Sequence, residues 1–314
     1  GYPGTMDQLV QTLLFGLSNG FVIALIALGY TLVYGIIQLI NFAHGEIYMM
    51  GSFMALTVIT AAGVSWTDPL GTRLGVIALA LVAAMLFAGA VNFTVDRIAY
   101  RRLRRAPRLA PLITAIGFSF VLQNIGIWWK GARPIQFPAL LPPTNILTDW
   151  FGLDTNITLS IPMLFVMVVT IPLLIVMTWF IRNTRLGKAM RATAQDRDAA
   201  ALMGIDVNRT ISLTFLLGGL LAGAAGLING LYNNQVVFNM GFFAGLMAFT
   251  AAVLGGIGNL TGAVLGGIFL GIVAALSDSY LQAQWTPAIV FAVLVLVIIF
   301  KPSGLLGEVV ADRA

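Results

Sequence analysis

The sequence predicts an all-α polytopic membrane protein with about eight to ten transmembrane or half-membrane helices. Hydrophobic residues make up 59% of the chain and charged residues only 9%, whereas a soluble domain carries about 25% charged residues. The mean hydropathy is +0.94, and several apolar runs reach the roughly 20 residues that a helix needs to cross a hydrocarbon core. We therefore expect residues 6–314 to form a single membrane domain.

Composition also limits the chemistry of the chain. It contains no Cys and a single His, which argues against a disulfide framework and a structural zinc site. We predict no metal site, no cofactor bound by this chain and no catalytic residue. The N-terminal apolar run has no basic flank ahead of it and is too long for a cleavable signal peptide, and we interpret residues 1–5, ahead of Met6, as a remnant of cloning.

The first half of the chain alternates apolar runs with short polar stretches. Residues 6–40 exceed one ordinary span, which favours a long or broken helix or a span plus a half-helix. A break is expected at Asn41, His44 and Glu46, where polar side chains interrupt the apolar sequence. The expected spans in this half are residues 6–40, 47–62, 74–95, 109–129 and 161–181, with a short loop at residues 63–73.

Charged and proline-rich segments predict the topology. Residues 97–108 carry six arginines and no acid, so the positive-inside rule makes this segment a cytoplasmic loop. Its partner is expected to be the lipid bilayer and not nucleic acid, because the patch is short. Residues 130–160 hold four prolines and form the main external loop, and residues 182–209, with nine of the 29 charged residues, form a second cytoplasmic loop.

The second half supplies four further apolar segments, at residues 211–232, 241–258, 262–281 and 285–300. An even number of crossings returns the polar C-terminal tail to the cytoplasm. Residues 41–51 and 259–267 each interrupt an apolar segment with Asn and Gly, after which the apolar run resumes. Such breaks at corresponding positions predict an internal repeat, with both breaks beside a membrane path.

Three stretches carry a resemblance to a known family. The sequence DAAALMG at residues 198–204 predicts a short helix ended by its glycine, and it resembles the Glu-Ala-Ala-x-x-x-Gly coupling sequence of bacterial ABC importers, with Asp for Glu. Residues 27–51 (ALGYTLVYGIIQLINFAHGEIYMMG) and 248–267 (AFTAAVLGGIGNLTGAVLGG) are similar to signature stretches of the permease subunits of branched-chain amino acid ABC importers. The LivH type of permease is the nearer match, and the resemblance covers nearly the whole chain.

The resemblance implies a permease of the bacterial cytoplasmic (inner) membrane that forms the translocation path for branched-chain amino acids. It implies four kinds of partner, namely a second permease that is a related but different chain, two ATPase subunits that bind ATP and Mg²⁺, an external binding protein, and lipid. ATPase coupling is then assigned to Asp198, Ala199, Ala200, Leu202, Met203 and Gly204. The chain itself lacks a Walker A loop, because Arg182 stands where Gly187-Lys188 would need a preceding glycine.

Polar side chains inside apolar spans are costly and are retained mainly when they are useful or well paired. We predict that a set of them lines or gates the path for a zwitterion: Asn41, His44, Glu46, Gln123, Asn124, Asn229 and Asn259, with Asp278 as a further candidate. A structural alternative stays open for His44 and Glu46, which could cap a helix end and pair with a neighbour.

Other functions stay open at this point. Similar permeases serve urea, short amides and other small amino acids. An ion-coupled secondary transporter would use His44, Glu46 and Asp278 as relay groups. An intramembrane enzyme is disfavoured, because His44-Gly45-Glu46 lacks the second His of an H-E-x-x-H site.

Overall fold

The computed structural model describes residues 5–38, 41–104, 106–107, 109–153, 155–256, 258–301 and 303–307. In this part of the chain, eight helices are long and apolar enough to cross a membrane, and a ninth apolar helix is shorter. The all-α polytopic prediction is therefore confirmed. Residues 1–4 of the predicted cloning remnant, Arg105 and Arg108 of the basic segment, and the end of the polar tail lie outside the described residues, whereas Thr5, the last residue of that predicted remnant, begins α1.

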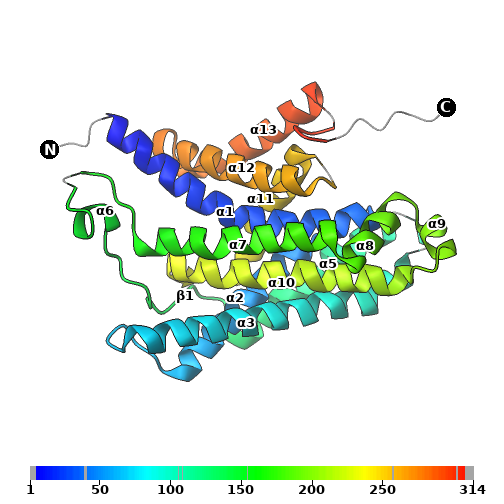
Figure 1. Ribbon diagram of the computed structural model, residues 1–314, viewed down its shortest axis with the longest axis horizontal. Coiled ribbons are helices and arrows are strands. Elements are labelled where there is room, and N and C mark those ends of the chain that lie inside the picture. The colour runs from blue at the N-terminus through cyan, green and yellow to red at the C-terminus, as the bar shows by residue number, and fades with distance from the viewer. Residues whose placement is uncertain are drawn as a thin grey trace.

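Helices dominate, and the described strands are confined to one short pair (Figure 1). The two strands pair antiparallel. In chain order the elements are α1 (Thr5–Ile37), α2 (His44–Ala62), α3 (Leu70–Val95), the π-helix η1 (Asp96–Tyr100), α4 (Arg101–Leu103), α5 (Leu109–Lys130), β1 (Ile135–Gln136), α6 (Ile146–Asp149), α7 (Ile161–Asn183), α8 (Arg185–Gln195), α9 (Arg197–Leu202), α10 (Val207–Asn233), β2 (Gln235–Val236), α11 (Met240–Gly255), α12 (Leu260–Tyr280), the 3₁₀ helix η2 (Ala283–Trp285) and α13 (Thr286–Phe300).

The core of the bundle is built around α1, α2 and α10, whose middles are almost entirely buried. Glycines allow these helices to approach closely. A Cβ placed on Gly271 of α12 would lie 2.3 Å from the Cα of Gly20 in α1, and one on Gly223 of α10 would lie 2.3 Å from the carbonyl oxygen of Ala84 in α3. Packing of backbone against backbone through small residues is the usual way in which membrane helices associate.

One end of the bundle gathers the two basic segments. Arg182 at the end of α7 bonds to Thr261 at the start of α12, and Arg104 contacts Asn208 at the start of α10. The chain after α13 returns to the same end, where the N–H of Leu305 donates to the carbonyl of Leu254. The described basic residues at the other end are Arg73, Lys130 and Arg133. The positive-inside rule therefore makes the Arg182 end cytoplasmic.

The predicted external loop lies at the opposite end. Its strand β1 pairs with β2, which directly follows α10. Gln11 near the start of α1 bonds to Thr158 of the loop, and Arg73 of α3 donates to the carbonyl of Leu140. The loop connects α5 to α7 across the outer end of the bundle. On the way it contacts the outer ends of α1 and α3 and the strand after α10.

Several expected boundaries differ from the structure. The basic segment is not a loop over its whole length, because α3 continues through η1 into α4 as far as Leu103. The helix α3 also starts at Leu70, so the end of the loop expected at residues 63–73 lies inside the helix. The helix α7 runs on to Asn183, past the end of the expected span at residue 181, with Pro172 in its interior. The amphipathic helix α8 forms within the segment expected to be a cytoplasmic loop.

Candidate functional site

The predicted coupling segment is a short helix, α9, with both ends fixed. The side chain of Asp196 accepts hydrogen bonds from the N–H groups of Asp198 and Ala199, each at 2.9 Å. At the other end, Gly204 has a φ of +83°. The N–H groups of Gly204 and of the residue after it donate back to carbonyls inside α9, which is the arrangement of a Schellman cap. The sequence-based expectation of a helix ended by Gly204 is confirmed.

The helix α9 presents apolar side chains to the outside of the chain. Leu202 and Met203 are 88% and 83% exposed, whereas Ala200 is buried. Asp198 and Ala199 also lie on the exposed side. Exposed apolar groups on a rigid, charged surface mark sites of protein interaction. The tip of α9 therefore has the character of a docking surface at the cytoplasmic end.

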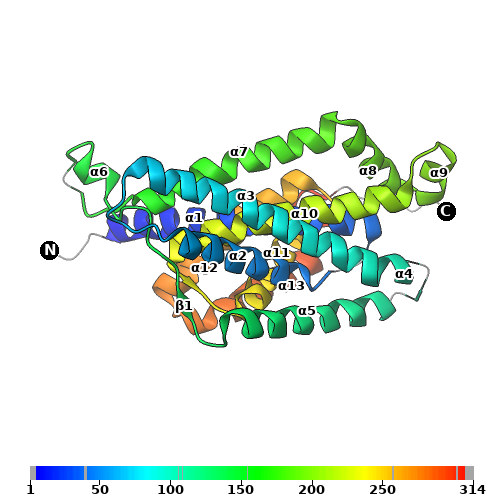
Figure 2. The same ribbon diagram turned by 90° about the horizontal axis from the view of Figure 1, so that it is seen from below.

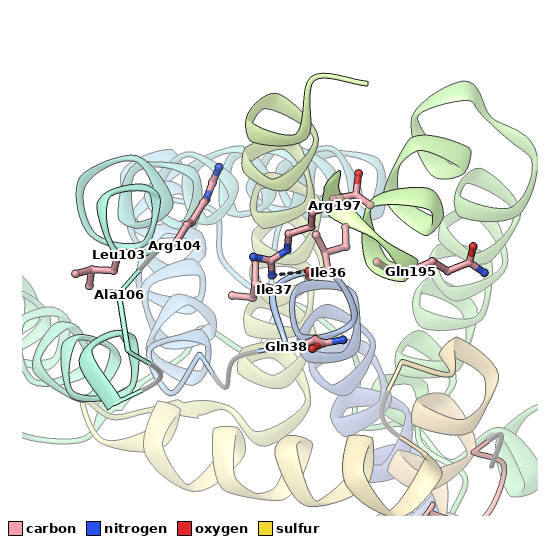
Figure 3. A pocket seen from close by; sticks show the side chains of 10 residues that line it. Ile36, Ile37, Gln38, Leu103, Arg104, Ala106, Gln195 and Arg197 are labelled. Carbon is pink, nitrogen blue, oxygen red and sulfur yellow. Dashed lines mark hydrogen bonds between the residues drawn. The ribbon is translucent and has the colours of Figure 1, made fainter. Parts of the chain in front are cut away.

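Arg197, the first residue of α9, ties this helix to the end of α1 (Figure 3). Its Nη2 donates to the carbonyl oxygen of Ile36 at 2.9 Å, in the last turn of α1, where a helix lacks donors of its own. Both residues line a cavity of about 370 Å³, together with Arg104. Burial and, secondly, the charge of Arg104 lower the pKa of the Arg197 guanidinium, although an arginine stays protonated at physiological pH.

Arg104 is held by a buried acid. It cannot accept a hydrogen bond from Arg197, because a guanidinium group only donates. Its Nη2 lies 2.8 and 2.9 Å from the two carboxylate oxygens of Asp96, a fully buried residue. The hydroxyl of Ser212 donates to the same carboxylate at 2.6 Å. This cluster joins η1 to the start of α10, so the inner ends of α1, α3, α9 and α10 are linked by hydrogen bonds around one cavity.

A second polar group lies deep in the bundle, around Glu46 in the first turn of α2. Its Oε1 accepts hydrogen bonds from the hydroxyl of Ser119 at 3.1 Å and from the amide of Gln123 at 2.8 Å. Its Oε2 has no partner among the described residues, and the whole side chain is buried. An ionisable group in a membrane span is a functional-site candidate by default.

The helices α2 and α11 both begin near the middle of the bundle. Gly45 lies directly against α11, since a Cβ on Gly45 would be 2.1 Å from the carbonyl oxygen of Gly241. The neighbouring Glu46 bonds to the middle of α5, which fixes the depth of both helix starts. Figure 2 shows α2 between α3 and α5, and α2 packs against both of these helices and against α11. Discontinuous helices that start at mid-depth commonly surround transporter binding sites.

His44 does not join the Glu46 group. Its imidazole packs against Gly29, where a Cβ would be 2.6 Å from Nε2, and meets the ring of Tyr30 edge-on with 4.7 Å between ring centroids. Neither ring nitrogen has a hydrogen-bond partner among the described residues. This placement is that of a buried packing residue facing α1.

Asn41 lies in the connection between α1 and α2. Its side-chain oxygen accepts hydrogen bonds from the hydroxyl of Tyr100 at 2.9 Å and from the N–H of Ala43 at 3.1 Å. The connection is therefore held against η1 on one side, while Arg197 holds the end of α1 on the other. The break predicted here is confirmed, although His44 and Glu46 belong to the helix that follows it.

The remaining predicted site residues lie elsewhere. Asn124 bonds to its own helix and is exposed, and Asn229 pairs with Asn233 one turn away. Asn259 caps α12 at the cytoplasmic end, accepting from the N–H of Gly262 and donating to the carbonyl of Leu306. Asn259 thus lies between α11 and α12 at the cytoplasmic end, whereas the break at Asn41 leads into α2, which begins beside α11. The repeat that relates these two breaks stays a prediction. Asp278 bonds to Thr286 near the outer end of α12.

Sequence reasoning missed three residues of these groups. Ser119 stands four residues before Gln123, so that both fall on one face of a helix, and this spacing was a usable signal. Tyr100 and Arg197 had none, because their partners are 59 and 161 residues away in the chain. Contacts over such separations require the folded bundle.

Comparison with known proteins places these features in a family context. The family model described as "Branched-chain amino acid transport system / permease component" matches residues 12–299. The chain is 41% identical, over 95% of its length and 96% of the relative, to the high-affinity branched-chain amino acid transport system permease protein LivH of Escherichia coli K12. It is 40% identical over the same shares to LivH of Salmonella typhimurium and to the permease protein BraD of Pseudomonas aeruginosa. No solved structure matches the chain.

Proposed function

The chain belongs to the family of branched-chain amino acid transport system permeases, and from this premise we propose that it forms the translocation path of an ATP-binding-cassette importer for branched-chain amino acids. It is a multi-pass protein of the inner membrane that works with partner subunits. An external binding protein delivers the amino acid, and separate ATPase subunits drive the alternation of access between the two sides.

The observation that carries this proposal is the tip of α9. It is a capped helix at the basic end of the bundle, and the side chains of Leu202 and Met203 are exposed in this chain. A partner subunit that binds there would bury both of them. An apolar surface of this kind needs a partner. A groove in an ATPase subunit fits its chemistry, because the motif that ends at Gly204 resembles the coupling sequence of such importers.

The subunit composition follows from the number of docking helices. Each chain supplies one α9 and therefore one ATPase contact. Two ATPase subunits, which hold ATP and Mg²⁺, then require two permeases, and we propose that the second is a related but different chain. The ATPases supply the energy, because the Gly187-Lys188 pair of this chain does not form a phosphate-binding loop.

We propose that Arg197 transmits the movement of α9 to the membrane interior. Its hydrogen bond to Ile36 couples the first residue of α9 to the last turn of α1. Five residues further along the chain, Asn41 is anchored to Tyr100, and Glu46 follows in the first turn of α2. A shift of α9 therefore acts on a short connection that leads directly to the Glu46 group.

A reconstituted importer tests the proposed function. The chain, a second permease and two ATPase subunits are placed in proteoliposomes with the binding protein and radiolabelled leucine outside and ATP inside. We expect uptake that requires both ATP and the binding protein. Uptake by this chain alone under a proton or sodium gradient would contradict the proposal and favour the ion-coupled alternative. Of its relay groups, His44 and Glu46 lie in the first turn of α2, whereas Asp278 lies near the outer end of α12.

A further inference from the structure

A small cavity lies beside the starts of α2 and α11, at the depth of the middle of α5. Its volume is about 260 Å³, which suits a small molecule, because pockets for drug-sized ligands are larger. The wall is mainly apolar and contains three phenylalanines. Its apolar lining residues are Phe42, Ile116, Phe120, Phe242 and Leu246.

The polar part of the wall has an unusual chemistry. Ser119 and Gln123 line the cavity, and both donate hydrogen bonds to the Oε1 of Glu46 behind them. The hydroxyl proton of Ser119 and an amide proton of Gln123 are thus directed to the carboxylate. The lone pairs of Ser119 and the amide oxygen of Gln123 are left as acceptors. Acceptors backed by a carboxylate suit an ammonium group, whereas the hydroxyl of Tyr30, which also lines the cavity, can donate as well as accept.

The mid-depth position of Ser119, Gln123 and Glu46 indicates that the cavity beside them does not face lipid. Polar and ionisable groups at mid-depth are expensive next to lipid and normally face a bundle interior or a water-filled cavity. The N-termini of α2 and α11 meet at the same place through Gly45 and Gly241, and non-helical backbone at this depth is tolerated where it lines a cavity. The side chains of Phe120 and Phe242 are exposed and also line this cavity.

We infer that this cavity is the side-chain selectivity pocket of the translocation path. The branched apolar side chain of the passing amino acid lies against Phe42, Ile116 and Phe120, while its ammonium group faces Ser119 and Gln123. Glu46 acts as a positioning residue that orients these two side chains. The inference rests on the proposed function. It makes the permease, and not only the external binding protein, selective among amino acids.

The test uses the complete importer in proteoliposomes, with leucine, valine, alanine and phenylalanine measured one at a time. Ile116→Phe narrows the cavity, and we expect leucine uptake to fall at least about tenfold relative to alanine uptake, since one methylene in an apolar pocket changes selectivity by about 10- to 200-fold. Ile113→Phe is the matched control, because Ile113 is on the same helix, is 67% exposed and does not line the cavity.

A second variant probes the ammonium contact. Gln123→Met keeps the length and removes the acceptor, so we expect the uptake of all four amino acids to fall by a similar factor, while the permease still assembles with its partner subunits. A cavity that only holds a lipid chain would leave both uptake and selectivity intact in this variant.

The outcomes separate this inference from the proposed function. Wild-type selectivity ratios in Ile116→Phe, or unchanged uptake in Gln123→Met, would overturn the pocket while ATP-driven transport stands. Absence of ATP-dependent uptake in the wild-type importer would overturn the proposed function itself. If Ile116→Phe does not assemble with its partners, Ile116→Ala tests the same wall, with an expected rise of phenylalanine uptake relative to leucine.

Discussion

Removal of the two exposed side chains at the tip of α9 is the sharpest test of how the chain meets its ATPase. Leu202 and Met203 are 88% and 83% exposed, and full burial of a Leu or Met side chain is worth about 1.5–3 kcal/mol. Scaled by these fractions, the double variant Leu202→Ala/Met203→Ala loses about 2.5–5 kcal/mol of binding free energy. This corresponds to an affinity roughly 60- to 4,000-fold weaker.

The assay is the binding of purified ATPase subunit to the permease in lipid nanodiscs, read as a dissociation constant. The double variant Phe151→Ala/Leu153→Ala is the matched control, because it removes exposed apolar side chains from the external loop at the opposite end. We expect the control to bind like the wild type. A dissociation constant within about twofold of the wild-type value in the α9 variant would refute the assignment of α9 as the docking surface.

Three further predictions concern the coupling helix and the deep helix contact. Arg197→Gln removes the hydrogen bond to α1 and is expected to lower transport about tenfold while ATP hydrolysis continues, with Arg197→Lys closer to wild type; equal loss of transport and hydrolysis would contradict this. Gly204→Val forces a left-handed backbone on a branched residue at a cost of about 1–2 kcal/mol, and coupled transport should fall while the folded fraction in size-exclusion chromatography is preserved. Gly241→Ala places a Cβ 2.5 Å from the Oε2 of Glu46 and should destabilise the chain by about 1–3 kcal/mol in thermal unfolding, whereas Gly71→Ala, with no atom within 4 Å, should not.

The sequence was informative wherever local periodicity or local chemistry decides the structure. Apolar runs long enough to span the bilayer predicted the long helices, and the glycine after an Ala-rich run predicted the end of α9. The basic segments predicted one shared end, because charge bias is a property of the sequence itself. These features depend on neighbours within a few turns of helix.

The parts that could not be predicted depend on distant partners. The Asn-Gly pattern at Asn259 looked like that of Asn41, yet local composition does not say whether a break lies at mid-depth or at the surface. In the structure, Asn259 is a helix cap at the cytoplasmic end, and the helix that starts opposite Gly45 begins at Met240, directly after Asn239 and close to the polar run at residues 233–235. Likewise, Glu46 was recognised as unusual, but the direction of its side chain was fixed only by α5.

The Arg197 contact and the Glu46 group are connected by a short stretch of chain. Arg197 holds the carbonyl of Ile36 at the cytoplasmic end, and ten residues later Glu46 holds Ser119 and Gln123 at the selectivity pocket. Among the described residues between them, the side chain of Asn41 is anchored to Tyr100. A displacement of α9 that this short connection does not absorb must move the start of α2. We therefore expect the docking of the ATPase to act on the proposed pocket through the connection between α1 and α2.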